Sequence, residues 1–207
     1  DIRALPKLEG TVHVNMALVV KFMRNYFFNP GTFPEIPAVT EPKNDDFLFH
    51  QGKTKGLGKI QFHDFRVAYG KVDLPNVSTF KKQIAVLEQF LIASASDVEA
   101  AAKQGKDIDF LLSLGEVFTL VAYGQLLLEY RELHPADLPD DLLEQIFDFM
   151  IRDCSKFALQ LYSKPSSTPQ QMELCQKMIM KPETNAARFE RIWTEVHALR
   201  DAYEMTP

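Results

Sequence analysis

Residues 107–132 read DIDFLLSLGEVFTLVAYGQLLLEYRE. The apolar side chains of this stretch recur at the three- and four-residue intervals of an amphipathic helix. The repeating positions are Phe110, Leu111, Leu114, Phe118, Val121 and Leu128. Asp107 stands in the position of an N-cap, where a carboxylate accepts from a free backbone N–H. Glu116 and Gln125 interrupt the apolar run, so we predict a buried helix here and no membrane span.

Four further segments show the same helical periodicity. We predict helices over about residues 78–103, 139–163 and 184–204, and one that begins at Pro169. The last has a clear start signal, because Thr168 can cap it, Pro169 suits the first helical position and Gln171 completes a capping box. Each helix has an apolar face that needs a neighbour and a charged face that we expect to be solvated. No segment alternates with the period of a strand, so we predict an all-α fold, an antiparallel helical bundle.

The region before this bundle divides into two parts. Apolar residues at helical spacing predict a helix over about 12–28. Residues 29–76 hold five prolines and five glycines, which break regular structure repeatedly. We therefore expect a long irregular connector between two packing units, ordered only where its aromatic side chains pack. Those aromatic residues are Phe47, Phe49, Phe62, Phe65 and Tyr69. The predicted division of the chain is 1–28, 29–76 and 77–207.

Composition sets outer limits on function. Lysine and arginine number 23 against 28 acidic residues, a net charge of −5, which argues against nucleic acid as a general partner. A hydrophobic fraction of 46% excludes wholesale disorder. Two cysteines, Cys154 and Cys175, make no disulfide framework, and no leader opens the chain, so we expect a cytoplasmic protein. Because the chain starts at Asp1 without a methionine, we expect a fragment, a processed subunit or the ordered part of something longer.

Most polar features favour structural roles. The five histidines show no spacing typical of metal ligands, so we expect no metal site. The glycine- and lysine-rich residues 52–59 are no phosphate-binding loop, because Phe47 stands where that motif needs a glycine. Gly115 and Gly124, inside the helix at 107–132, are expected to allow close helix contacts.

The tripeptide Glu9-Gly10-Thr11 is different, because it directly precedes a long predicted helix. A glycine after the carboxylate lets a ligand approach the backbone, and Thr11 can cap a helix whose free N–H groups favour polar ligand atoms. A carboxylate held there could abstract a proton. The alternative is that Glu9 only belongs to a capping turn.

A longer pattern surrounds this tripeptide. Asp1-Ile2-Arg3 is followed after five residues by Glu9-Gly10-Thr11, and then by Val14-Asn15. This resembles the end of the acyl-CoA dehydrogenase flavoprotein fold, which has Asp-x-Lys/Arg, five residues, Glu-Gly-Thr, two residues and Ile-Gln before its last long helix. The rest of the chain resembles one bacterial branch of that family, in which an extra C-terminal helical domain follows the dehydrogenase fold. The motif itself covers only residues 1 to about 28.

The resemblance implies a reaction and a set of site residues. Glu9 would be the catalytic base that removes the α-proton of an acyl-CoA thioester, while the β-hydrogen passes as hydride to FAD and a trans-2-enoyl-CoA forms. Desolvation would raise the pKa of this carboxyl towards that of the acidified carbon. Gly10 would line the acyl-CoA channel, and Thr11, Val12 and His13 would contact FAD. Electron-transferring flavoprotein is the implied acceptor, within fatty acid β-oxidation.

The resemblance also implies what the chain lacks. Leu8 replaces the aromatic residue usual in the family, which changes the expected pocket shape. Most of the flavin site is absent, so we expect the chain to need the remaining dehydrogenase domains, in the same or a companion chain, and to be inactive alone. We expect a homo-oligomer, with the bundle aiding its contacts or covering the active-site mouth. The alternatives are a non-catalytic helical interaction module, with Glu9 only a capping residue, and an acyl-CoA oxidase.

Overall fold

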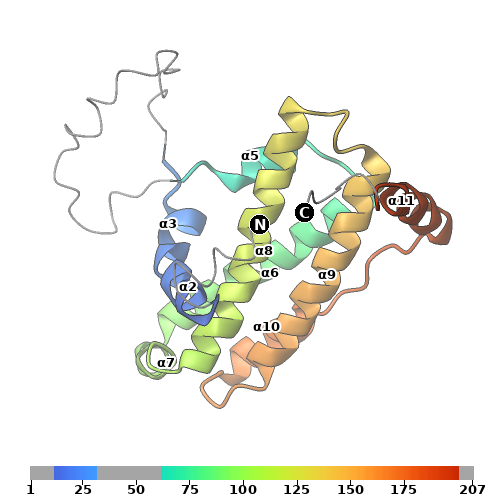
Figure 1. Cartoon of the computed structure of the whole chain (residues 1–207). Coiled ribbons are helices and arrows are strands. Elements are labelled where there is room, and N and C mark those ends of the chain that lie inside the picture. Colours follow the sequence, from blue (N-terminus) through green and yellow to red (C-terminus); the bar gives the residue numbers. More distant parts are fainter. Residues whose placement is uncertain (1–11, 32–61, 201–207) are drawn as a thin grey trace, which may run out of the picture.

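The computed structural model describes residues 12–31 and 62–200, and the described residues form helices and no strand (Figure 1). This confirms the predicted all-α helical bundle. The elements are α2 (Val12–Val19), the 3-10 turn η2 (Val20–Phe22), α3 (Met23–Phe28), α5 (Phe65–Gly70), α6 (Pro75–Ser96), α7 (Val98–Gln104), α8 (Ile108–Leu133), α9 (Asp140–Tyr162), α10 (Pro169–Met178) and α11 (Ala186–Ala198).

The N-caps predicted at Asp107 and Thr168 are present. The Asp107 carboxylate accepts from the Phe110 N–H at the start of α8. At α10, the Thr168 hydroxyl accepts from the Gln171 N–H, and the Gln171 side chain accepts from the Thr168 N–H, with Pro169 as the first helical residue. Each cap satisfies N–H groups that have no partner inside the helix.

The helices differ from the prediction in several places, and the helix expected over 184–204 ends at Ala198. The helix expected over 78–103 is two helices, because Asp97 leaves the helical conformation and caps α7 by accepting from the Ala100 N–H. The helix expected over 12–28 contains the 3-10 turn η2. The connector is not irregular throughout, since residues 65–70 form α5, capped by Asp64.

The long helices α6, α8 and α9 form the body of the bundle (Figure 1). Helix α10 packs on α6 and α9, whereas α2 packs on α8 and α5 packs on the same helix further along. Helix α11 contacts α9 and lies on the outside, across the bundle from α2 and α3 (Figure 1). Helix α8 is long and apolar enough to cross a membrane by length and composition, but half of its most apolar window is buried inside the bundle, as in a core helix.

The core continues from the bundle into the N-terminal helices. Tyr26 and Phe27 of α3 are buried against Phe65 of α5 and Phe118 of α8, with ring centroids 5.0–5.8 Å apart. Phe65 and Tyr69 thus pack as expected for the connector's aromatic residues, whereas Phe47 and Phe49 lie outside the described residues. The division of the chain into domains stays a prediction.

Candidate functional site

The residues predicted to carry chemistry lie at the start of α2. Glu9, Gly10 and Thr11 are outside the described residues. Helix α2 (Val12–Val19) is the first described element and follows the Glu-Gly-Thr motif in the sequence. His13 lies in this helix, and its side chain is exposed. His13 is therefore the one predicted site residue whose side chain lies among the described residues.

Beside His13 the surface is hollowed over a volume of about 340 Å³. Helices α2, α8 and α9 meet there. The lining residues are His13, Met16, Asp109, Leu112, Ser113, Glu116, Phe157, Gln160 and Lys164. None of the four ionisable groups, His13, Asp109, Glu116 and Lys164, forms an ion pair within the described ranges.

Two contacts fix α2 against α8 beside this hollow. The Gly115 Cα faces the Met16 carbonyl so closely that an added Cβ would lie 2.8 Å from that oxygen. One turn further along, the Thr119 hydroxyl contacts the Met16 sulfur at 3.4 Å. Gly124 allows a second close approach, to the Tyr69 hydroxyl. The predicted role of both glycines in close helix contact is confirmed.

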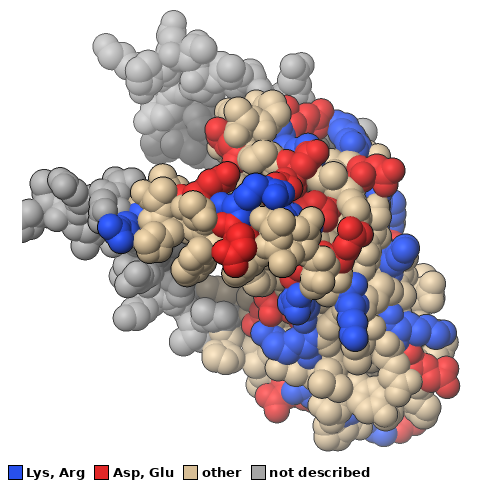
Figure 2. Space-filling view, turned by 90° about the vertical axis from the view of Figure 1, so that its right-hand side faces the viewer, with Lys and Arg blue, Asp and Glu red and all other residues tan. Residues whose placement is uncertain are grey.

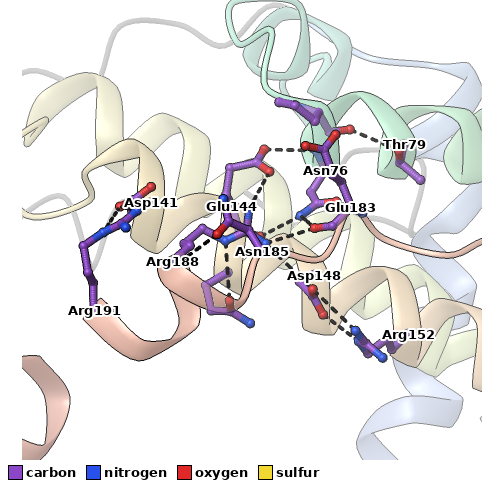
Figure 3. Close-up of polar contacts among 12 residues, drawn as sticks. Asn76, Thr79, Asp141, Glu144, Asp148, Arg152, Glu183, Asn185, Arg188 and Arg191 are labelled. Atoms are coloured by element: carbon purple, nitrogen blue, oxygen red, sulfur yellow. Dashed lines mark hydrogen bonds and ion pairs between the residues drawn. The ribbon is translucent and has the colours of Figure 1, made fainter. Parts of the chain in front are cut away.

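A second polar cluster, which the sequence analysis missed, is buried between α6, α9 and α11 (Figure 3). Glu144 accepts from the Asn76 N–H at 3.0 Å and pairs with the Arg188 guanidinium at 3.3 Å. Arg188 also faces Asp148 at 3.8 Å and donates to the Glu183 carbonyl at 3.1 Å. All of Asn76, Glu144, Asp148 and Arg188 are buried, so the prediction that the charged helix faces are solvated is wrong here.

Electrostatics explain why these charges are held together. Burial raises the pKa of Glu144, and the Asn76 N–H and the Arg188 guanidinium oppose that rise. An unpaired carboxylate at this depth would cost several kcal/mol, so each partner is needed by the others. Every charged group in the cluster has a partner from this chain, and we therefore assign it a structural role: it fastens α11 to the bundle.

The sequence of α9 carries a signal that could have indicated this cluster. Glu144 and Asp148 are four residues apart and alternate with Leu143, Phe147 and Ile151, which are buried on the same helix. Acidic residues that share a helix face with core positions need a cation from elsewhere in the fold. The sequence does not say which cation, because Arg188 is 44 residues from Glu144.

The two cysteines are buried and do not form a disulfide. Burial raises the pKa of the Cys154 and Cys175 thiols to about 12, so neither carries a thiolate at neutral pH. Both behave as small apolar core residues, as the sequence predicts. Within the ranges that the structure describes, no group of three or more His, Cys, Asp or Glu residues is placed to hold a metal ion.

No protein-family model, no curated protein and no solved structure matches this chain. The resemblance to acyl-CoA dehydrogenases therefore stays a prediction from the spacing of residues 1–15.

Proposed function

We propose that this chain is the C-terminal portion of an FAD-dependent acyl-CoA dehydrogenase. The observation that carries the proposal is the ungapped pattern from Asp1 to Asn15, with Glu9-Gly10-Thr11 at its centre. Residues Val12 to Phe28 support it, because they are helical apart from the 3-10 turn η2, and the proposed motif precedes the last helix of the dehydrogenase fold.

Within the proposal, Glu9 removes the α-proton of an acyl-CoA thioester. Its backbone N–H helps to hold the thioester carbonyl, whose negative charge grows in the transition state. Gly10 leaves room for the acyl chain, because no Cβ intrudes. FAD, held mainly by the remaining dehydrogenase domains, would supply the acceptor for the hydride that leaves the β-carbon. Electron-transferring flavoprotein is the proposed acceptor of the electrons.

The hollow beside His13 limits how much of the cofactor this chain can hold. At about 340 Å³ it is at the small end of ligand sites, which run from roughly 300 to 1,000 Å³. It is open, and Asp109 and Glu116 face it together with Lys164. These residues suit a small polar group and do not fit a whole flavin cofactor. The remaining dehydrogenase domains must therefore supply most of the FAD site, with Thr11, Val12 and His13 as the proposed contacts from this chain.

The test is the substitution Glu9→Gln in the complete protein that contains this chain. The amide keeps the size of the side chain and cannot accept the proton, so we expect turnover of an acyl-CoA to fall by about 10²- to 10⁴-fold or more. The visible spectrum should show FAD still bound. Glu173→Gln, at an exposed position of α10, is the matched control and should leave turnover unchanged. Equal turnover in both variants would contradict the proposal.

A second candidate function is a non-catalytic helical interaction module, in which Glu9 only caps α2. Exposed large apolar side chains favour it, among them Phe28, Ile92 and Trp193. This candidate predicts little change in turnover from Glu9→Gln and a loss of assembly when the apolar surface residues are replaced.

A further inference from the structure

Helix α11 carries an apolar stripe that is largely exposed to solvent. Its attachment buries Arg188 and Ile192 only. The sequence predicts that the apolar face of this helix is buried, and that is wrong for Phe189, Trp193 and Val196, which are 43%, 57% and 55% exposed. These three residues follow the i, i+4, i+7 spacing of one helix face, and the Phe189 and Trp193 rings stack. The helix therefore presents a ready-made apolar ridge.

The ridge carries a negative charge beside it. Glu190 follows Phe189 directly, and its carboxylate forms no ion pair with any described residue. Its neighbour Arg191 is already paired with Asp141. On the side of the molecule that carries α11, acidic and basic side chains are otherwise interspersed (Figure 2).

An apolar groove lies between η2 and α3 on one side and α6 on the other. Its volume is about 680 Å³, and Leu114 of α8 lines it as well. The remaining lining residues are Val20, Met23, Arg24, Phe28, Asn29, Leu91, Ile92 and Ala95. Phe28 and Ile92 are exposed. Arg24 is the charged residue of the lining, and it forms no ion pair within the part of the chain that the structure describes.

We propose that the groove of one copy of this chain receives α11 of a second copy. An apolar ridge at i, i+4 and i+7 is the form in which an amphipathic helix enters an apolar groove. The Glu190 carboxylate beside the ridge and the Arg24 guanidinium in the groove lining have opposite charges, and neither has an ion-pair partner among the described residues. In this contact Phe189, Trp193 and Val196 become buried, whereas within a single copy they stay exposed.

The positions of the two surfaces decide the kind of assembly. Helices α3 and α11 lie on opposite sides of the molecule, so a chain cannot fill its own groove (Figure 1). The contact is head-to-tail, and it closes into a ring or continues as a chain of copies. This inference is independent of the chemistry proposed for Glu9.

A concentration series of the 207-residue chain tests the inference. Trp193 is the only tryptophan, and it lies in the middle of the ridge. We expect the sedimentation coefficient to rise with concentration up to roughly 1 mM, the range of weak association. Over the same range the tryptophan emission should move to shorter wavelength, because the ring leaves water. A chain that stays monomeric throughout, or that associates without a shift in emission, would overturn the inference.

Charge reversal identifies the two surfaces. Arg24→Glu or Glu190→Arg alone should weaken association by about tenfold or more, and the double variant should restore it. Lys177→Glu is the matched control for the first change, since Lys177 is exposed on α10. Glu195→Arg is the control for the second, because Glu195 is two residues from Trp193 and so faces away from the ridge. If the controls weaken association equally, or the double variant stays monomeric, the pairing of these surfaces is wrong.

Discussion

The helices at the two ends of the described chain are fastened to the bundle by different chemistry. At the N-terminal end, Tyr26 and Phe27 enter an aromatic cluster with Phe65 and Phe118. At the C-terminal end, the buried guanidinium of Arg188 holds α11 to α9 through its ion pairs with Glu144 and Asp148. Ile192 is the only large apolar side chain of α11 that is buried.

The difference has consequences for both ends. Burying aromatic side chains stabilises the fold in proportion to the apolar area removed from water, and this hydrophobic effect is non-directional. A buried ion pair depends on each partner, and it adds little net stability beyond fixing one arrangement. Fastening α11 through Arg188 therefore holds the helix in place while its aromatic residues stay outside. In the N-terminal helix α3, Tyr26 and Phe27 are buried in the core.

The largest expected effect is that of Phe27→Ala. Phe27 is fully buried, so its loss should lower the free energy of unfolding by about 3–5 kcal/mol. Urea unfolding followed by circular dichroism measures this. The neighbouring Phe28→Ala is the control, and it should cost under about 1 kcal/mol because Phe28 is exposed. Equal losses of unfolding free energy at both positions would contradict the claim that the buried aromatic cluster fastens the N-terminal helices.

Arg188→Ala should have the next largest effect. It leaves two buried carboxylates without their shared cation, but Arg152 still faces Asp148 and the Asn76 N–H still faces Glu144. We expect a loss of about 3 kcal/mol, at the low end of the range for breaking a buried pair. Urea unfolding followed by circular dichroism measures this loss. Arg191→Ala removes an exposed pair with Asp141 and should cost at most about 1 kcal/mol.

Gly115→Ala tests how closely α2 must approach α8. The new Cβ would meet the Met16 carbonyl, and overpacking of this kind costs more than the gain in helix propensity. We expect a net loss of about 1–2 kcal/mol in unfolding free energy. At Gly70 nothing lies within 4 Å of an added Cβ, so Gly70→Ala should be neutral or stabilising. A stabilising Gly115→Ala would show that the contact of α2 with α8 is loose.

The smallest effect is the pH dependence contributed by the Asp107 cap. Hydrogen bonds from the Ser166 hydroxyl and the Phe110 N–H lower the pKa of this carboxyl below its ordinary value of 3.8. The folded state thus binds the proton less tightly than the unfolded chain, so the stabilisation is present above the unfolded value and is lost as the pH falls through the folded one. Asp107→Asn still caps the helix and does not titrate. The stability difference between wild type and variant, from urea midpoints, should change in favour of the variant between about pH 6 and about pH 3. A constant difference would contradict this.

Local signals explain what the sequence made predictable. The capping box at Thr168 and the cap at Asp107 depend on residues within one turn, and both are present as predicted. Asp97 caps α7 by the same local chemistry. The apolar pattern continues across Asp97, so periodicity alone did not predict that the helix ends there. Helix α5 is only six residues long, too short for periodicity to detect among prolines and glycines.

Long-range pairings were not predictable in this way. The contact of Arg188 with Glu144, and the outward face of α11, depend on how distant segments meet in space. For the candidate site, the sequence predicted the helix after Glu-Gly-Thr and named His13, but the acidic residues facing His13 come from α8, about a hundred residues later. Glu9, Gly10 and Thr11 lie outside the described residues, so their arrangement stays a prediction.

The proposed base is tested most directly by a single anaerobic titration of the complete natively purified protein with an acyl-CoA. Without an electron acceptor, reduction of bound FAD bleaches its visible absorption. We predict that the wild-type protein bleaches and that the Glu9→Gln variant keeps its FAD spectrum but does not bleach. Bleaching of both proteins at the same rate, or a wild-type protein without a flavin spectrum, would contradict the proposed dehydrogenase function.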